Sequence, residues 1–302
     1  MISLSVVICT FNPRKDHLLR TFEGLRRQSL NTDEWELLVV DNASSIPVAD
    51  SFDLAWHRNA RVLREDRLGI SFARVCGLRA TKSDLFVFVD DDNILNPNYL
   101  EESLRIGRGH PNLGAWGGTI EPEYEIPVPP ELAPYMGLLA IRKVSKAAWS
   151  NAYNTAVTPY GAGMTIRRSV MEQYISPVRE KQRMKFGRKG LETFFSCEDT
   201  DMAWCAIDIG LGCGVFPELI LLHLIPQRRI SESYLLKIQE GTYSANYILH
   251  RQRGVQYWRT RPMSGYISRM RFWLKFAMAT RVDRSFALAR IRGEDKAAVA
   301  EI

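Results

Sequence analysis

The amino-acid sequence of 302 residues predicts an α/β fold, with a doubly wound, mostly parallel sheet and a helical C-terminal extension. Three observations lead to this prediction. Short apolar runs alternate with amphipathic segments along the first part of the chain, which is typical of repeated strand–helix units. Polar residues follow directly where these runs end, and from Ser231 onward the periodicity is helical. We therefore predict one domain over residues 1–226 and the extension over residues 227–302.

The composition excludes several classes of protein. Hydrophobic residues make up 46% of the chain and charged residues 25%, as in a globular protein with an ample core. The five cysteines include no C-x-x-C pair, which argues against a zinc site or a disulfide framework and fits a reducing compartment. The N-terminus lacks the features of a signal peptide, and no run reaches the ~18–20 apolar residues that span a bilayer. We expect a cytoplasmic protein, and its net charge of +6 favours an anionic partner.

The first apolar run, residues 3–9, is nearly continuous, as in a strand that is covered on both faces. It ends at Thr10, Phe11, Asn12 and Pro13, where Asn12 suits a helix N-cap and Pro13 the first helical position. This turn contains no glycine, so it matches neither a P-loop nor a G-x-G-x-x-G motif. Its aromatic residue could instead stack on a base, which would leave the phosphates to a metal.

The strand–helix alternation continues to residue 108. The expected elements are a strand over 36–40, a strand over 61–63, a helix from Ile70 that carries Arg74, a strand over 85–89 and a helix over 97–108. Asp41 follows the first of these strands, and three aspartates, Asp90 to Asp92, follow the last. Ligands of doubly wound sheets bind beyond the carboxyl ends of the strands, so one crevice could gather Thr10, Asp41 and the aspartates.

The three consecutive aspartates are a candidate metal site. Side chains alternate along a strand, so Asp90 and Asp92 would share one face and Asp91 would point to the other. Two carboxylates on one face repel each other unless a cation lies between them, and oxygen ligands suit Mg²⁺ or Mn²⁺. The alternative is a polar turn after a buried strand, where aspartate is common. The polar residues at neighbouring strand ends favour the metal site.

Beyond residue 108 the pattern is less regular. The sequence predicts a strand over 113–120, a proline-rich connector or arm over 121–135, and strand character again over 160–168. Gly161 and Gly163 in the last segment allow close approach of the backbone to a ligand. The alternative is that these glycines mark only a bulge or a turn.

A second acidic cluster comprises Glu198, Asp199 and Asp201 and opens a helix. Acidic residues in a first turn are favoured by the helix dipole alone. The functional alternative is a general base that is aimed into the crevice. A basic run over 179–189 precedes the cluster; it is either a solvated loop or a segment that closes over a leaving diphosphate.

A buried strand over 217–224 contains His223. A single histidine in a core is more often a hydrogen-bonded structural residue. The alternative is that His223 is a third metal ligand beside Asp92, because imidazole binds Mn²⁺.

The last strong helix that the sequence predicts in the C-terminal extension covers residues 264–281. Aromatic and basic side chains interleave there, which suits contact with a membrane surface. The alternative is a helix packed on the preceding domain with its basic side in water. Membrane contact would favour a lipid-linked acceptor.

Six motifs in this order are similar to those of one known family. They are Val6 to Asn12, Val39 to Ser44, Arg74 with Gly77, Val89 to Asp92, Glu198 to Asp201, and Pro217 with His223. In these motifs the chain resembles the family 2 glycosyltransferases of the GT-A fold, over roughly residues 3–225. The resemblance implies a nucleotide-sugar half over about 1–95 and an acceptor half over about 96–226.

The resemblance also implies an activity, namely inverting transfer of a sugar from a nucleotide-diphosphate sugar to an acceptor hydroxyl. We expect a UDP-sugar donor, a saccharide or lipid-linked acceptor, and Mn²⁺ or Mg²⁺ as cofactor, as in the synthesis of cell-surface polysaccharide or glycolipid. The candidate residues are Asp199 (base) and Glu198 for catalysis; Thr10, Phe11, Asn12, Asp41, Arg74, Asp90, Asp91 and Gly163 for the donor; and Asp92, Asp90 and His223 for the metal.

Two other functions are weaker alternatives. A sugar-phosphate nucleotidyltransferase would show a basic, glycine-rich loop after the first strand, and this chain does not. A non-catalytic binder of anionic surfaces or nucleic acid would leave both acidic clusters without purpose, and no nucleic-acid motif is present. We therefore predict an enzyme without a nucleic-acid partner, in the cytoplasm or peripherally bound to the inner face of the membrane through residues 264–281.

Overall fold

The computed structural model describes residues 2–81, 83–177, 197–260 and 266–299, and these form two compact units. The first unit takes in 1–123, 140–185 and 198–225, and the second takes in 124–139, 186–197 and 226–302. The basic run predicted over 179–189 lies outside the described residues, as do residues 264 and 265 of the predicted membrane-contacting helix.

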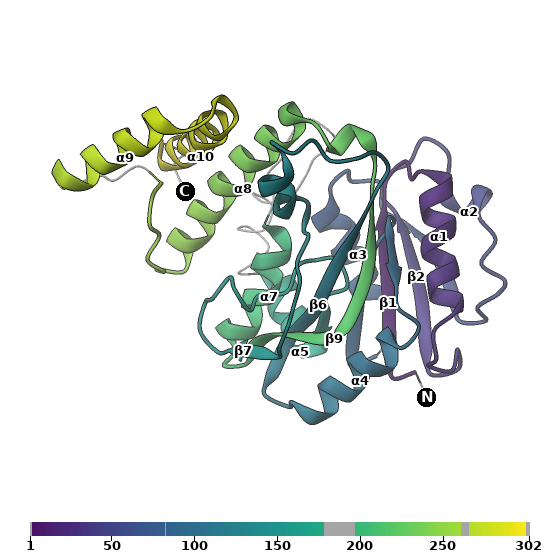
Figure 1. Ribbon diagram of the computed structural model, residues 1–302. Coiled ribbons are helices and arrows are strands. Elements are labelled where there is room, and N and C mark those ends of the chain that lie inside the picture. The colour runs from purple at the N-terminus through teal and green to yellow at the C-terminus, as the bar shows by residue number, and fades with distance from the viewer. Residues whose placement is uncertain (1, 82, 178–196, 261–265, 300–302) are drawn as a thin grey trace. The chain divides into compact units, whose positions relative to one another are not determined.

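The first unit is built on a sheet of nine described strands in the order β3-β2-β1-β4-β8-β6-β9-β5, with β7 paired to β9 (Figure 1). Their bounds are β1 Leu4–Thr10, β2 Trp35–Asp41, β3 Ala60–Arg64, β4 Leu85–Asp90, β5 Asn93–Leu95, β6 Leu113–Tyr124, β7 Ala148–Ser150, β8 Thr165–Arg167 and β9 Gly212–Ile225. Strands β3, β2, β1 and β4 pair in parallel, whereas β8 on β4 and β5 on β9 are antiparallel. The predicted α/β fold class is confirmed.

Helices cover both faces of this sheet. They are α1 Lys15–Arg26, α2 Val48–Ser51, α3 Ile70–Ala80, α4 Tyr99–Gly109, α5 Arg168–Ile175 and α7 Glu198–Asp208. Alternate residues of β1 enter different hydrophobic clusters: Val6 and Ile8 pack with α1 and α4, and Val7 and Cys9 pack with α3, α5 and α7. The near-continuous apolar pattern of the strand therefore reflects burial on both sides.

Two local expectations were wrong. Asn12 is not an N-cap, because α1 begins at Lys15 after Arg14; Asn12 has a positive φ of 48°, which asparagine tolerates in turns. The strand β4 ends at Asp90, and Asp91 and Asp92 form a turn before β5. The alternation of a strand therefore does not determine where the side chains of Asp91 and Asp92 point.

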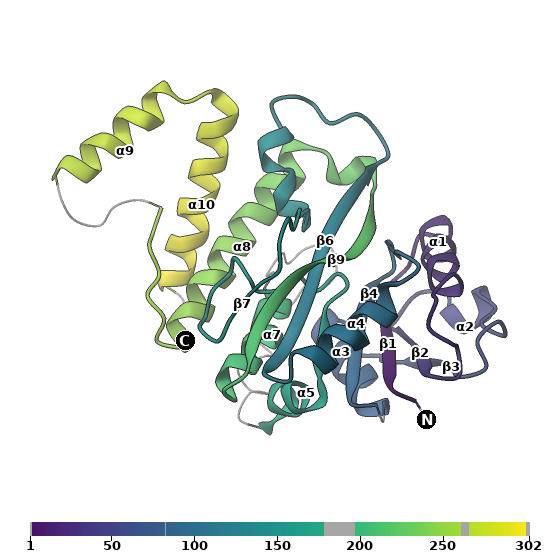
Figure 2. The same cartoon turned by 60° about the horizontal axis from the view of Figure 1, so that its bottom comes forward.

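The second unit is helical, as predicted for the extension, and also contains the proline-rich segment 124–139. Its elements are the short 3₁₀ helices η1 Ala133–Leu139 and η2 Gln227–Arg229, with α8 Glu232–Gln252, α9 Tyr266–Met278 and α10 Arg281–Val299. Helices α8 and α10 lie side by side in both views (Figures 1 and 2). Helix α9 ends at Met278, and the whole of α10, which periodicity did not predict, follows it. Among the described helices none has the length and apolarity that crossing a bilayer requires.

Close contacts hold α8 and α10 together. A Cβ atom on Gly293 of α10 would lie 2.2 Å from the carbonyl oxygen of Glu240 in α8, so only glycine allows this approach. Tyr135 of η1 stacks on Phe286 of α10 with ring centroids 3.6 Å apart. Cys197, the last residue before α7, has a φ of 98°, and its Sγ lies 3.3 Å from Asn246 Oδ1 of α8.

Candidate active site

The parallel register brings the predicted polar residues to one edge of the sheet. Thr10 lies opposite Asp41 between β1 and β2, and Cys9 lies opposite Asp90 between β1 and β4. The hydroxyl of Thr10 donates a hydrogen bond to Asp91 Oδ2. Asp91, which strand alternation would have turned away, is thus held at this edge by Thr10.

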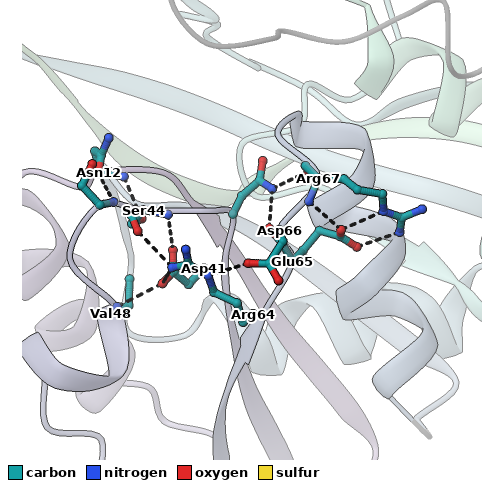
Figure 3. Close-up of polar contacts among 10 residues, drawn as sticks. Asn12, Asp41, Ser44, Val48, Arg64, Glu65, Asp66 and Arg67 are labelled. Atoms are coloured by element: carbon teal, nitrogen blue, oxygen red, sulfur yellow. Dashed lines mark hydrogen bonds and ion pairs between the residues drawn. The ribbon is translucent and has the colours of Figure 1, made fainter.

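Asp41 is the centre of a buried polar network, drawn in Figure 3. It is 1% exposed, and its Oδ1 accepts the amide of Ser44 at 2.9 Å. Its Oδ2 accepts the amide of Val48 at 3.2 Å and Arg64 Nη1 at 2.8 Å. Burial alone would raise the pKa of Asp41, but the hydrogen bonds from Ser44, Val48 and Arg64 hold it below its ordinary value. Asp41 therefore holds the turn after β2 as an ionised group.

The neighbouring loops are fixed in a similar way (Figure 3). The amide of Asn12 donates to Ser44 Oγ at 2.9 Å, and Asn12 Oδ1 accepts the amide of Ser45 at 2.8 Å. Asn42 Nδ2 donates to the carbonyl of Arg67 at 2.8 Å. These bonds tie the ends of β1, β2 and β3 into one frame.

Three exposed apolar side chains flank this frame. Phe11, Ile46 and Leu68 are exposed. Each is adjacent in the chain to a residue of this hydrogen-bond network. Exposed apolar groups beside buried polar groups are typical of a site for a planar, partly apolar ligand. A nucleoside base is such a ligand.

His223 lies beside Asp92, as the sequence suggested. Strand β5 pairs with β9 so that Asn93 is opposite His223, and the amide of Leu224 donates to the carbonyl of Asp92 at 2.9 Å. His223 Nε2 is 3.5 Å from Asp92 Oδ2, and both residues are buried. A carboxylate oxygen and an imidazole nitrogen thus face each other at the end of β4.

These residues suit a metal that is shared with a ligand. Across the described residues, no three Asp, Glu, His or Cys side chains are arranged to hold a metal by themselves. Mg²⁺ commonly binds through one or two carboxylates and takes the rest of its shell from water and phosphate oxygens. Asp90, Asp92 and His223 provide ligands of the right chemistry for Mg²⁺ or Mn²⁺ under that condition.

Arg74 links the two acidic clusters. Its guanidinium is buried, lies over the ring of Phe88 at 5.4 Å, and places Nη1 3.8 Å from Glu198 Oε1. Burial would lower the pKa of Arg74, but Glu198, Asp90 and Asp199 raise it well above its ordinary value. Carboxylates from both acidic clusters thus surround one buried cation.

Asp199 is held at the start of α7 by backbone donors. The amide of Gly161 donates to Asp199 Oδ2 at 2.9 Å, and the amide of Thr200 donates to Oδ1 at 2.7 Å. The residue is half-buried. A Cβ atom on Gly161 would lie 2.6 Å from Arg74 Nη2, which explains the glycine.

Gly163 has a structural explanation instead. It adopts a φ of +73°, and a Cβ atom there would lie 2.3 Å from the hydroxyl of Tyr99. That hydroxyl donates to the carbonyl of Gly163 at 2.7 Å. Core packing therefore requires glycine at position 163.

Sequence reasoning missed two residues of this region, namely Ser44 and Arg64. Ser44 belongs to the Asp-Asn-Ala-Ser motif and could have been found there. Arg64 carries no local signal, because its partner Asp41 lies on a different strand.

Comparison with known proteins finds a matching family and several relatives. The family model described as glycosyl transferase family 2 matches residues 5–175. A glucosyl-dolichyl phosphate glucuronosyltransferase of Haloferax volcanii is 27% identical over 129 residues, which cover 41% of this chain and 40% of that protein. An uncharacterized glycosyltransferase of Haemophilus influenzae is 28% identical over 114 residues, 36% of each chain. The matches thus span well under half of these relatives.

A solved structure extends the likeness in fold to nearly the whole chain. The crystal structure of S. aureus TarS 1-349 superposes with a TM-score of 0.52 at 14% identity, covering 98% of this chain and 89% of that one. At this identity the likeness concerns the fold. Because the family model covers more than half of the sequence, the chain belongs to glycosyl transferase family 2.

Proposed function

We propose that the protein moves a sugar from a nucleotide-diphosphate sugar, preferably a UDP-sugar, to a hydroxyl of a saccharide or lipid-linked acceptor, with inversion. The observation that carries this proposal is Arg74, around which Asp90 of the donor edge and Glu198 and Asp199 of the second cluster converge. The reaction would serve the synthesis of cell-surface polysaccharide or glycolipid, in the cytoplasm at the inner face of the membrane. The relative whose name includes a dolichyl phosphate substrate favours a lipid-linked acceptor.

The frame at the ends of β1 to β3 would bind the nucleoside. Phe11 would stack on the base, with Thr10 and Asn12 at its border. A bond from the base to Asp41 requires Arg64 to move, because its guanidinium now occupies Asp41 Oδ2. Arg64 is half-exposed and has Asp66 as a second partner at 3.0 Å, so it can release Asp41 without losing every ion pair.

The edge at the end of β4 would hold the diphosphate. Asp90, Asp92 and His223 would hold Mn²⁺ or Mg²⁺, which supplies positive charge to the diphosphate as it leaves. Asp91, bound to Thr10, lies next to this site and would orient the donor.

Asp199 would act as the general base. Two backbone amides orient its carboxylate, and Arg74 lies nearby. As Asp199 takes the proton of the acceptor hydroxyl, that oxygen forms a bond to the anomeric carbon from the side opposite the diphosphate. The bond from the anomeric carbon to the diphosphate breaks in the same step, which inverts the configuration without an enzyme nucleophile. General-base assistance is worth roughly 10²–10⁴ in rate.

The test is a donor screen with nucleotide-diphosphate sugars and saccharide or lipid-linked acceptors, with and without Mn²⁺ or Mg²⁺. We expect transfer with an inverted product. Asp199→Asn should retain the donor Kd and lose roughly 10²–10⁴ in kcat, because only proton transfer is removed. Asp92→Asn should weaken metal-dependent donor binding instead.

The matched control is Asp208→Asn, because Asp208 ends the same helix and its carboxylate bonds to Tyr153. It should transfer at the wild-type rate. Full transfer by Asp199→Asn would overturn the base assignment, and release of pyrophosphate from nucleoside triphosphate and sugar phosphate would identify a nucleotidyltransferase.

A further inference from the structure

Helix α9 presents apolar side chains to solvent. Met270, Trp273, Leu274 and Met278 follow the spacing of one helix face, and they are 46%, 51%, 54% and 80% exposed. Over residues 268–278 no side chain is buried. Amphipathic helices of globular proteins bury such a face, so this one is complementary to something outside the chain segments that the structure describes.

The rest of the helix determines the chemistry of that partner. Arg269, Arg271 and Lys275 are exposed, α9 contains no acidic residue, and no ion pair of these three cations occurs among the described residues. At about 100° per residue, Arg269 lies roughly 40° to one side of Trp273 and Arg271 roughly 20° beyond Met278. The two arginines therefore border the apolar face on both sides.

The positive charge of the protein is concentrated in the same part of the chain. Residues 226–302 contain 15 Lys and Arg against 6 Asp and Glu, a net charge of +9. Residues 1–225 contain 25 against 28, a net charge of −3. The apolar face of α9 thus belongs to a strongly cationic segment, which favours an extended anionic surface over a second copy of the same chain.

We propose that α9 binds the surface of an anionic lipid bilayer and lies in its headgroup region. Met270, Trp273, Leu274 and Met278 enter the boundary between headgroups and acyl chains, and Arg269, Arg271 and Lys275 bind lipid phosphates. The half-buried rings of Phe272 and Phe276 contact Trp273, with centroids 5.3 and 5.6 Å away, and hold it on the apolar face. This proposal does not depend on the reaction that the first unit catalyses.

The test is co-sedimentation of the full-length protein with vesicles. We expect binding to vesicles of equal parts phosphatidylcholine and phosphatidylglycerol, little binding to pure phosphatidylcholine, and release at high salt. Each surface cation contributes about fivefold in affinity, so Arg269→Gln with Arg271→Gln and Lys275→Gln should weaken binding roughly a hundredfold. Trp273→Ser with Leu274→Ser should weaken binding even at low salt, because it removes apolar area rather than charge.

The matched control replaces three exposed cations of the first unit with Gln, namely Lys15, Arg79 and Arg108. It should bind like wild type, and circular dichroism should show all variants folded, since none of the changed side chains is buried. Equal binding to both vesicle types, or wild-type binding by the Arg269–Lys275 variant, would overturn the proposal. So would a concentration-dependent dimer in sedimentation that Trp273→Ser with Leu274→Ser abolishes, because that face would then belong to a second copy.

Discussion

Among single residues, Arg74 shows what a sequence can and cannot reveal about a site. A guanidinium that is taken out of water must be offset by opposite charges, and Arg74 obtains them from Glu198, Asp90 and Asp199. Its place on a helix after a strand end was predictable, because strand and helix periodicity are local. Its partner Glu198 was not, because the two lie far apart in the chain and no periodicity relates them. For the same reason, the sequence could suggest that Asp92 and His223 are neighbours, but only the pairing of β5 with β9 establishes it.

Asp41 yields a prediction about stability and pH. Its pKa in the folded protein is below the ordinary value of 3.8, so it stabilises the fold fully above that pH. The contribution is lost as the pH falls through the lower, folded pKa. We expect Asp41→Asn to reduce the free energy of unfolding by about 1–3 kcal/mol at pH 7, because Val48 and Arg64 lose a charged acceptor.

Urea unfolding at pH 7 and near pH 3 measures this effect. The difference between the variant and wild type should shrink at the lower pH, where the wild-type carboxyl is approaching protonation. Asp53→Asn is the control, because Asp53 accepts only an amide of its own loop, that of Ala55, and should change little. An equal loss for Asp41→Asn at both pH values would show that its charge is not what stabilises the turn.

Among the elements, the strands β1 to β4 were predicted to within one or two residues. Strands β6 and β9 extend four and five residues further than predicted, β8 begins five residues later, and the short and the weakly amphipathic elements were not predicted. The bounds of β1 and β2 followed from runs of apolar residues that end abruptly in polar ones. Helix α10 was missed because small residues and charges dominate it, and its burial depends on packing against α8. The turn at Asp91 and Asp92 was considered only as the alternative, because a strand end is set by hydrogen bonding to a neighbour, which alternation does not reveal.

The contact between α8 and α10 yields a prediction for Gly293. Alanine at this position favours helix by about 1 kcal/mol, but its Cβ would collide with the backbone oxygen of Glu240. Overpacking against a backbone atom costs roughly 1–3 kcal/mol, so Gly293→Ala should lower the thermal stability of the helical unit. Circular dichroism during heating measures this change.

Gly137→Ala is the matched control, since nothing lies within 4 Å of a Cβ atom there. It should leave the melting temperature unchanged or raise it slightly. A Gly293→Ala protein that melts as high as wild type would mean that α8 and α10 can separate without cost.

For the whole molecule, the division into units was only partly visible in the sequence. The change from mixed to helical periodicity occurs close to residue 226, where the second unit resumes. The assignment of 124–139 to the second unit rests on tertiary contacts such as Tyr135 with Phe286, and the proline pattern predicted only an arm or connector. The periodicity of a sequence does not indicate which unit such an arm belongs to.

The ligand set of the proposed metal predicts how the whole protein responds to a chelator. Since no three described side chains form a metal group by themselves, the metal should bind weakly without donor. We expect EDTA to abolish transfer, and excess Mg²⁺ or Mn²⁺ to restore it, while the melting temperature of the donor-free protein stays the same. A fall of several degrees in EDTA would instead indicate a resident metal that stabilises the fold.

The backbone at Cys197 has a consequence for how the proposed base is aimed. Cys197 directly precedes α7, which begins at Glu198. Cys197 has a φ of 98°, which residues other than glycine rarely adopt. Its thiol donates a hydrogen bond to Asn246 Oδ1 of α8. The proposed base, Asp199, is the second residue after Cys197. The positive φ at Cys197 therefore fixes the direction in which the chain enters α7, and with it the position of the carboxylate two residues later.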